Sequence, residues 1–204
     1  SKTFVSKRLL RYGKFILIPS SFSSVNHFDP SINYIEELKR KKTLQSKASI
    51  ENFTRYYEIK KKTFQEYLSA IVSLSKDRPE MNIVIRPHPS ENLTLYEKLA
   101  ASFDNVFADN RFSIQPWILS CEAVIHHYCT TAIEAALLNK PILGFRPFPD
   151  KKSENEFPFN ISNVSSNTPE LLDCVQRHCD VKRRNGLSIN QQKHLKNNLA
   201  GFFS

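Results

Sequence analysis

Short apolar runs alternate along the chain with longer segments in which apolar residues recur at helical spacing. The continuous apolar runs indicate buried strands, and they lie at residues 14–19, 81–85, 105–107, 123–125 and 141–145. Helical spacing is found at about 50–74, 93–103, 114–120, 131–138, 169–179 and 188–202. Strands that alternate with helices build βαβ units. The expected fold is therefore α/β, a Rossmann-like parallel sheet with helices on both faces.

The length of 204 residues suits one α/β domain. Residues 1–14 are basic and are expected to form a linker or a short helix that leads into the domain. Residues 15–204 are expected to form a single α/β domain. In the longest helical pattern, Phe53, Phe64 and Leu74 are expected on the buried face, and the lysines at 60–62 on the polar face.

The formal net charge is +9, with basic runs at 39–42, 60–62 and 182–184. Such an excess suits solvated helix faces, phosphorylated substrates, anionic lipid or nucleic acid. The chain carries no RNA-recognition aromatic signature, zinc finger or basic zipper, so nucleic acid is not an expected partner. No apolar run approaches the roughly 20 residues that span a bilayer, which predicts a cytoplasmic protein, with peripheral contact to an anionic inner membrane left open.

Several cofactor classes lack their sequence signals. The chain has only four glycines, and it contains neither a Gly-x-Gly-x-x-Gly fingerprint nor a Walker loop. Its four cysteines have no zinc-site spacing and are expected to be reduced thiols. The sequence therefore predicts no cofactor and no protein-held metal, and it argues against a standard dinucleotide oxidoreductase and a P-loop NTPase.

Ligands of parallel α/β sheets bind beyond the carboxyl ends of the strands, where this sequence places three polar segments. In the segment 126–134 a helix start and the hydroxyls of Thr130 and Thr131 are expected to hold a phosphate, and His126 lies beside them. Glu134 is a candidate for hydrogen bonds to a ribose diol. An alternative needs no ligand, because Thr131-x-x-Glu134 also has the spacing of a capping box.

The other two segments are 86–92 and 19–27. Prolines on both sides of His88 are expected to hold its ring in one orientation beside Arg86, and both groups suit a phosphate. A structural hydrogen bond is the alternative for His88, and an ordinary loop is the alternative for residues 19–27. Candidate contacts to the donor sugar or phosphate are Ser20, Ser21, Asn26, Ser90 and Glu91.

Three motifs in order carry a family resemblance: FILIPSSFSSVN at 15–26, IRPHPSEN at 85–92, and HHYCTTAIEA at 126–135 with NKP at 139–141. They resemble the bacterial surface carbohydrate biosynthesis proteins, which are similar to GT-B glycosyltransferases. The motifs also resemble, more weakly, the capsule Kdo transferases, which have a His-Pro motif, and the CDP-glycerol glycerophosphotransferases, which have an Arg-x-His-Pro motif. The resemblance covers roughly residues 15–148.

The resemblance implies the C-terminal donor domain of a GT-B glycosyltransferase that moves a sugar from a nucleotide-activated donor to a bacterial surface polysaccharide. Residues 15–204 would then form its nucleotide-sugar-binding domain. It implies that the half binding the glycan acceptor lies outside this chain. Arg86 and His88 are the expected catalytic residues, acting on the leaving phosphate with Thr130 and Thr131. The base is expected within 112–117, where Pro116 and Trp117 are expected to contact the nucleotide.

The His-Pro similarity favours a CMP-sugar donor, with a UDP-sugar next. Two alternatives stay open. One is a sugar-nucleotide epimerase or a polyol-phosphate transferase on the same scaffold, and the other is a non-catalytic binding domain of a capsule assembly complex.

Overall fold

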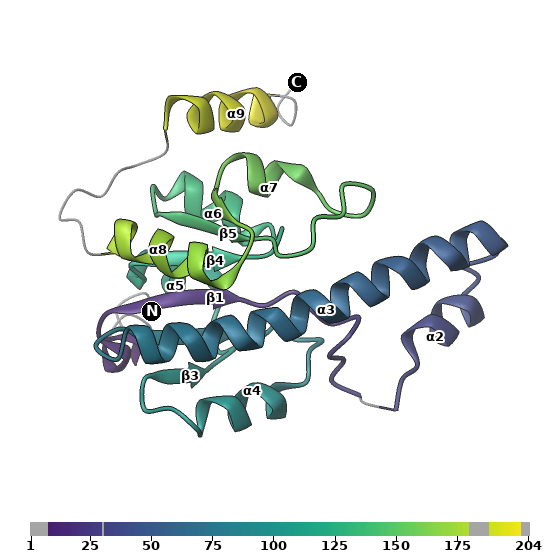
Figure 1. Ribbon diagram of the computed structural model, residues 1–204, viewed down its shortest axis with the longest axis horizontal. Helices are drawn as coiled ribbons and strands as arrows, with labels where there is room; N and C mark the ends of the chain where they lie inside the picture. Colours follow the sequence, from purple (N-terminus) through teal and green to yellow (C-terminus); the bar gives the residue numbers. More distant parts are fainter. Residues whose placement is uncertain (1–7, 30, 180–187, 201–204) are drawn as a thin grey trace.

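The computed structural model describes residues 8–29, 31–179 and 188–200. Its parallel strands form one sheet in the order β3-β2-β1-β4-β5-β6 (Figure 1). The strands are β1 (Phe15–Pro19), β2 (Asn82–Arg86), β3 (Val106–Ala108), β4 (Ala123–His126), β5 (Ile142–Phe145) and β6 (Asn163–Ser165). This order confirms the predicted Rossmann-like sheet, because β1 lies at the centre and the chain continues outward from it in both directions.

Helices cover both faces of the sheet (Figure 1). They are the 3₁₀ helix η1 (Leu10–Tyr12) and the α-helices α2 (Tyr34–Arg40), α3 (Lys47–Asp77), α4 (Leu93–Ala100), α5 (Ile114–Ser120), α6 (Thr131–Leu137), α7 (Glu156–Asn160), α8 (Thr168–Cys179) and α9 (Ile189–Ala200). Alternate residues of β1 face opposite sides: Ile16 joins a core with α3, α4 and α8, and Leu17 joins a core with α5 and α6.

Most predicted elements are found with boundaries shifted by a few residues, but the helices α2 and α7 and the strand β6 were not predicted. The long helix begins earlier than expected, because the N-cap residue Ser46 forms a reciprocal capping box with Ser49 in the first turn. Residues 201–202 of the last predicted helix lie outside the described residues. The described part of segment 1–14 packs into the domain, since Leu9 and Tyr12 are buried in the core that contains α5.

The helix α3 extends past the sheet. Its 31 residues span about 46 Å at 1.5 Å per residue, whereas a five-residue strand spans only about 17 Å. Its buried residues lie from Lys60 onward. The first half of α3 and the short helix α2 therefore form a helical hairpin that projects beyond the carboxyl ends of the strands (Figure 1). This hairpin stands next to the edge at which such sheets bind ligands.

Candidate functional site

The strand order reverses between β1 and β4, and we call the region outside the carboxyl ends of these two strands the crevice, since sheets of this kind bind ligands there. The loop after β1 begins at Ser20, and the loop after β4 begins at His127. Ser21, on the first of these loops, contacts the second, because its Oγ donates a hydrogen bond of 3.2 Å to the carbonyl of His127. Two segments that are about a hundred residues apart in the sequence thus meet at this point.

Glu91 ties the loop after β2 to the loop after β1. Its carboxylate accepts hydrogen bonds from the hydroxyls of Ser20 (2.6 Å) and Tyr96 (2.5 Å) and from the backbone N–H groups of Phe22 (3.1 Å) and His88 (3.3 Å). Glu91 is 4% exposed. A carboxylate held by four donors fixes the relative position of the two loops.

The predictions for Ser20, Asn26 and Glu91 as sugar or phosphate contacts are therefore revised. All three side chains are buried. Ser20 binds Glu91, and the Asn26 Nδ2 donates to the carbonyl of Asn92 at 3.3 Å. These groups are used inside the protein, where they hold the rim of the crevice in shape.

His88 and Ser90 stay accessible on the loop after β2. The imidazole of His88 is exposed, and its Nδ1 accepts the backbone N–H of Ser90 (3.2 Å) and lies 2.6 Å from the Ser90 Oγ. Because Nδ1 acts as an acceptor, the proton of the neutral ring is on Nε2. His88 therefore offers an oriented N–H donor.

Arg86 ends β2 and is half-buried. Its Nη2 donates a 2.7 Å hydrogen bond to the carbonyl of Phe112, and its Nε is buried with no hydrogen-bond partner. Burial lowers the pKa of Arg86, and the carboxylates of Asp109 and Glu134 oppose this shift. The structure therefore places the Glu134 carboxylate of α6 close enough to act electrostatically on Arg86 at the end of β2.

The segment 112–117 does not supply the expected base. Its residues are Phe, Ser, Ile, Gln, Pro and Trp, so it has no carboxylate, imidazole or amine. Trp117 is fully buried and donates through Nε1 to the carbonyl of Arg111 at 2.8 Å, which leaves no surface for a nucleotide. Pro116 is half-buried. Gln115 is exposed, and its Nε2 donates to Glu134 at 2.9 Å.

The start of α6 differs from the prediction in one respect. Thr130 occupies the N-cap position and makes no capping hydrogen bond through its side chain, and Thr131 is the first residue of the helix. The alternative of a Thr131–Glu134 capping box is therefore wrong, because Thr131 lies inside the helix and the carboxylate of Glu134 binds Gln115. The exposed hydroxyl of Thr130 is not used by a cap, so it is available at the crevice.

His126 belongs to the interior. The ring is fully buried and stacks on Phe159, with ring centroids 5.7 Å apart. Its Nε2 lies 2.7 Å from the Ser162 Oγ, and burial lowers the pKa of His126 to about 3. A side chain without exposed surface does not contact a nucleotide, so the predicted role of His126 is revised to a structural one.

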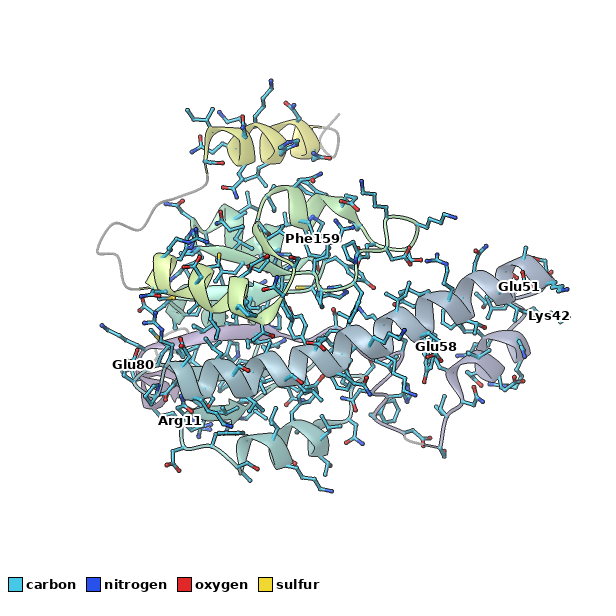
Figure 2. The ribbon with its side chains drawn as sticks, in the orientation of Figure 1. Arg11, Lys42, Glu51, Glu58, Glu80 and Phe159 are labelled. Atoms are coloured by element: carbon cyan, nitrogen blue, oxygen red, sulfur yellow. The ribbon has the colours of Figure 1, made fainter. Side chains whose placement is uncertain are left out.

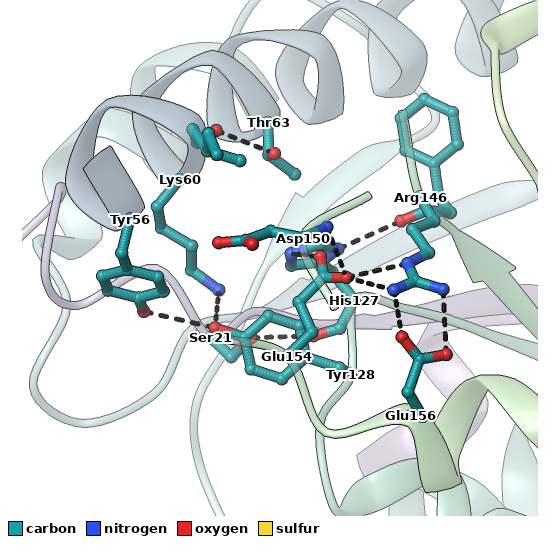
Figure 3. A network of polar contacts seen from close by, with 12 residues as sticks. Ser21, Tyr56, Lys60, Thr63, His127, Tyr128, Arg146, Asp150, Glu154 and Glu156 are labelled. Atoms are coloured by element: carbon teal, nitrogen blue, oxygen red, sulfur yellow. Dashed lines mark hydrogen bonds and ion pairs between the residues drawn. The ribbon is translucent and has the colours of Figure 1, made fainter. Parts of the chain in front are cut away.

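A cluster of polar side chains around Lys60 lies beside the crevice and was not predicted from the sequence (Figure 3). Lys60, expected on the polar face of its helix, is only 2% exposed. Its Nζ donates to the hydroxyl of Tyr128 at 3.0 Å, and burial lowers the pKa of Lys60 to about 7. The spacing Lys60–Phe64–Tyr67 follows the buried stripe of α3, and this was the signal available in the sequence.

The three carboxylates labelled in this cluster in Figure 3, those of Asp150, Glu154 and Glu156, are engaged in ion pairs. Arg146 binds Glu154 at 2.7 Å and also pairs with Glu156, while Arg55 binds Asp150 at 2.8 Å. The buried ring of His127 donates from Nδ1 to the carbonyl of Phe145 at 3.2 Å, and its Nε2 lies 3.6 Å from Glu154. Burial lowers the pKa of His127 well below its ordinary value, so the ring is neutral.

Two negative findings hold for residues 8–29, 31–179 and 188–200. In these ranges no group of three or more His, Cys, Asp and Glu residues is placed to hold a metal ion. Within the same ranges no helix is long and apolar enough to cross a membrane. The four cysteines are thiols and not disulfides, as expected.

No protein-family model matches the chain, and no curated protein matches it in sequence. In structure it is similar to the UDP-GlcNAc 2-epimerase of Methanocaldococcus jannaschii in complex with UDP-GlcNAc and UDP, with a TM-score of 0.55 and 12% identity over 98% of this chain and 49% of that chain. The Neisseria meningitidis UDP-GlcNAc 2-epimerase bound to UDP-GlcNAc has a TM-score of 0.53 and 14% identity over 98% and 48%. The S. aureus MnaA–UDP structure has a TM-score of 0.50 and 12% identity over 96% and 47%.

At these identities the likeness is one of fold. The chain has the Rossmann-like α/β fold of GT-B-type domains. It spans about half the length of the solved structures that it matches.

Proposed function

We propose that this chain is the nucleotide-sugar-binding domain of a glycosyltransferase that moves a sugar from a nucleotide-activated donor to a bacterial surface polysaccharide. One observation carries the proposal: Arg86, His88, Thr130 and Glu134 surround the carboxyl ends of β2 and β4, next to the point where the strand order reverses. Sheets of this kind bind nucleotides there. The glycan acceptor would bind through a second domain.

Each of these groups has a role in the proposed site. The Nε2–H of His88 and the guanidinium of Arg86 stabilise the leaving phosphate, where negative charge develops as the glycosidic bond breaks. Thr130 and Thr131 add hydroxyl donors on the opposite loop. Glu134 accepts hydrogen bonds from the ribose diol, which requires exchange of its contact with Gln115. Ser21 and Ser90 line the side nearest the donor sugar.

The nucleotide that carries the donor sugar is identified by testing several nucleotides. The sequence resemblance favours a CMP-sugar, and UDP-sugar is the next candidate. The similar solved structures were obtained with UDP-GlcNAc and UDP, which supports giving UDP equal weight in the experiment. Calorimetry with CMP, CDP, UDP and GDP should therefore give heat for at least one of them.

Two variants test the site. Because the His88 ring and the Thr130 hydroxyl are exposed, His88→Ala and Thr130→Ala should leave the free energy of unfolding nearly unchanged. Each should weaken nucleotide binding by roughly ten- to a hundredfold, as expected when a hydrogen bond to a charged group is lost. Arg86→Ala should weaken binding and stability together, because Arg86 also binds the Phe112 carbonyl.

His194→Ala on α9 and Ser120→Ala at the opposite edge of the sheet are matched controls, since both residues are exposed. They should bind like the parent. Absence of heat for all four nucleotides with folded protein would contradict the proposal, and so would parental affinity in both site variants.

An epimerase on the same scaffold is the second candidate, favoured by the fold shared with UDP-GlcNAc 2-epimerases. The discriminating measurement uses the longest natural protein that contains this chain. Release of free epimerised sugar nucleotide without any acceptor would favour the epimerase, whereas transfer that requires an acceptor glycan would favour the glycosyltransferase.

We also propose peripheral contact with anionic membrane through the tip of the α2–α3 hairpin. Lys42 and Glu51 lie at this tip, and the basic run 39–42 ends there (Figure 2). Glu36 and Glu37 pair with part of this run, which reduces its net charge. The basic residues 182–184 lie outside the described part of the chain. Vesicles with anionic lipid should bind the protein, and binding should weaken as salt rises. Equal binding to neutral vesicles would contradict this contact.

A further inference from the structure

Lys60 lies at the switch point itself, between the two loops that form the crevice (Figure 3). Its Nζ is 4.6 Å from the ring centroid of Phe22, on the loop after β1. It is 4.2 Å from the ring centroid of Tyr128, on the loop after β4. The helix α3 thus places one ammonium group at the meeting point of both loops.

The charge of Lys60 has no counter-ion in the part of the chain that the structure describes. Its Nζ donates a hydrogen bond to the neutral hydroxyl of Tyr128. The carboxylates that act on it from a distance are Glu91 and Glu154. Both are engaged elsewhere, Glu91 by Ser20 and Glu154 by Arg146. A buried ammonium without a carboxylate partner destabilises the free protein. An anionic ligand that supplied the missing negative charge would relieve this cost.

The Tyr128 side chain packs against the Lys60 ammonium, whose Nζ is 4.2 Å from the ring centroid. Tyr128 is half-buried whereas Lys60 is buried, and the Tyr128 hydroxyl contacts the Lys60 Nζ and the hydroxyl of Tyr56, which is 3.2 Å away. The backbone of Tyr128 has φ 38°, in the left-handed region that costs free energy for a bulky residue. The cover over the ammonium is therefore a strained residue held by two hydroxyl contacts.

We propose that Lys60 binds a phosphate group of the ligand that enters the switch point, after the phenol of Tyr128 has moved off the ammonium. The proposal rests on the proposed function where that phosphate belongs to a nucleotide sugar. The phosphate contact itself does not require a nucleoside. Burial holds the pKa of Lys60 near 7, and an arriving phosphate would favour the charged form of the amine.

Inorganic pyrophosphate is the probe, and calorimetry with the full chain is the measurement. Lys60→Met removes the charge and keeps a flexible apolar stem, and it should weaken pyrophosphate binding at least tenfold. Lys61→Met is the matched control, because Lys61 is the exposed neighbour on the same helix, and it should bind within about twofold of the parent. Tyr128→Phe, which removes the hydroxyl contact to Lys60, should bind pyrophosphate as tightly as the parent or more tightly.

Thermal unfolding separates a binding role from a structural one. If Lys60 only props the two rings apart, Lys60→Met should lower the melting temperature and leave pyrophosphate affinity unchanged, and this result would overturn the proposal. If Lys60 binds phosphate, the melting temperature of the free protein should be unchanged or higher, since an unpaired buried charge has been removed.

A measurement on the parent keeps the proposal testable should Lys60→Met not fold. The ¹³Cε shift of Lys60 reports the pKa of its amine, and saturating pyrophosphate should raise that pKa. An unchanged titration, or no binding of pyrophosphate at all, would overturn the proposal. If Lys60→Met binds nucleotide as tightly as the parent, the proposed role of Lys60 is wrong and the proposed function is unaffected. If Lys60 binds pyrophosphate but the protein binds no nucleotide, the proposed function is wrong and the phosphate contact of Lys60 is supported.

Discussion

The adjacent histidines His126 and His127 are buried and neutral, which predicts that the domain loses stability in mild acid. Ser162 donates through Oγ to the carbonyl of Pro158 at 2.6 Å, so the Nε2 of His126 must donate to Ser162. The Nδ1 of His126 then faces the interior without a hydrogen-bond partner. A proton on Nδ1 would create a buried cation with an unsatisfied donor, which explains the low pKa of this ring.

The magnitude follows from the two pKa values. The pKa of His126 is about 3 in the folded protein and about 6.5 in an unfolded chain. Below pH 6.5 the unfolded chain takes up a proton that the folded protein does not, so the free energy of unfolding falls as the pH falls. For one such histidine the loss between pH 7.5 and pH 5 is about 2 kcal/mol. His127 acts in the same direction because burial also lowers its pKa.

Urea unfolding at pH 7.5 and pH 5 measures this loss. Trp117, the single tryptophan and fully buried, reports unfolding by fluorescence. His126→Gln retains an amide donor for Ser162 and cannot titrate, so it should lose about 2 kcal/mol less than the parent over the same pH range. His88→Gln is the control, because the His88 ring is exposed, and its loss should equal that of the parent. Equal losses in the His126→Gln variant and the parent would refute this reasoning.

Two further substitutions test the hydrogen bonds by which Glu91 joins the loops after β1 and β2, and the close approach of α7 to the sheet. Glu91→Gln removes a charged acceptor from four donors and should lower the free energy of unfolding by about 1.5–3 kcal/mol in urea titrations, with no change if the carboxylate is unimportant. Gly144→Ala would place its Cβ 3.0 Å from the Phe159 ring, which is itself stacked on His126. It should cost about 1–3 kcal/mol. A melting temperature equal to that of the parent would show that the ring can yield.

The pattern of the sequence was sufficient for the fold class. Continuous apolar runs predicted the five strands from β1 to β5, because a strand buried on both faces needs apolar side chains on both. The strand β6 was missed because two of its three residues, Asn163 and Ser165, are polar, so it forms no continuous apolar run. Polar segments after the strands also predicted the edge at which the candidate site lies.

Tertiary structure decided which polar groups at that edge face a ligand and which face the interior. Glu91 and Ser20 are 71 residues apart, and only the pairing of β1 with β2 brings the two into contact. Lys60 is one of three consecutive lysines, yet the position of α3 on the sheet buries this one and leaves Lys61 exposed. Local sequence sets which face of a helix or strand a residue occupies. The charged and hydrogen-bonding groups that surround the residue come from other segments, so only the assembled fold determines them.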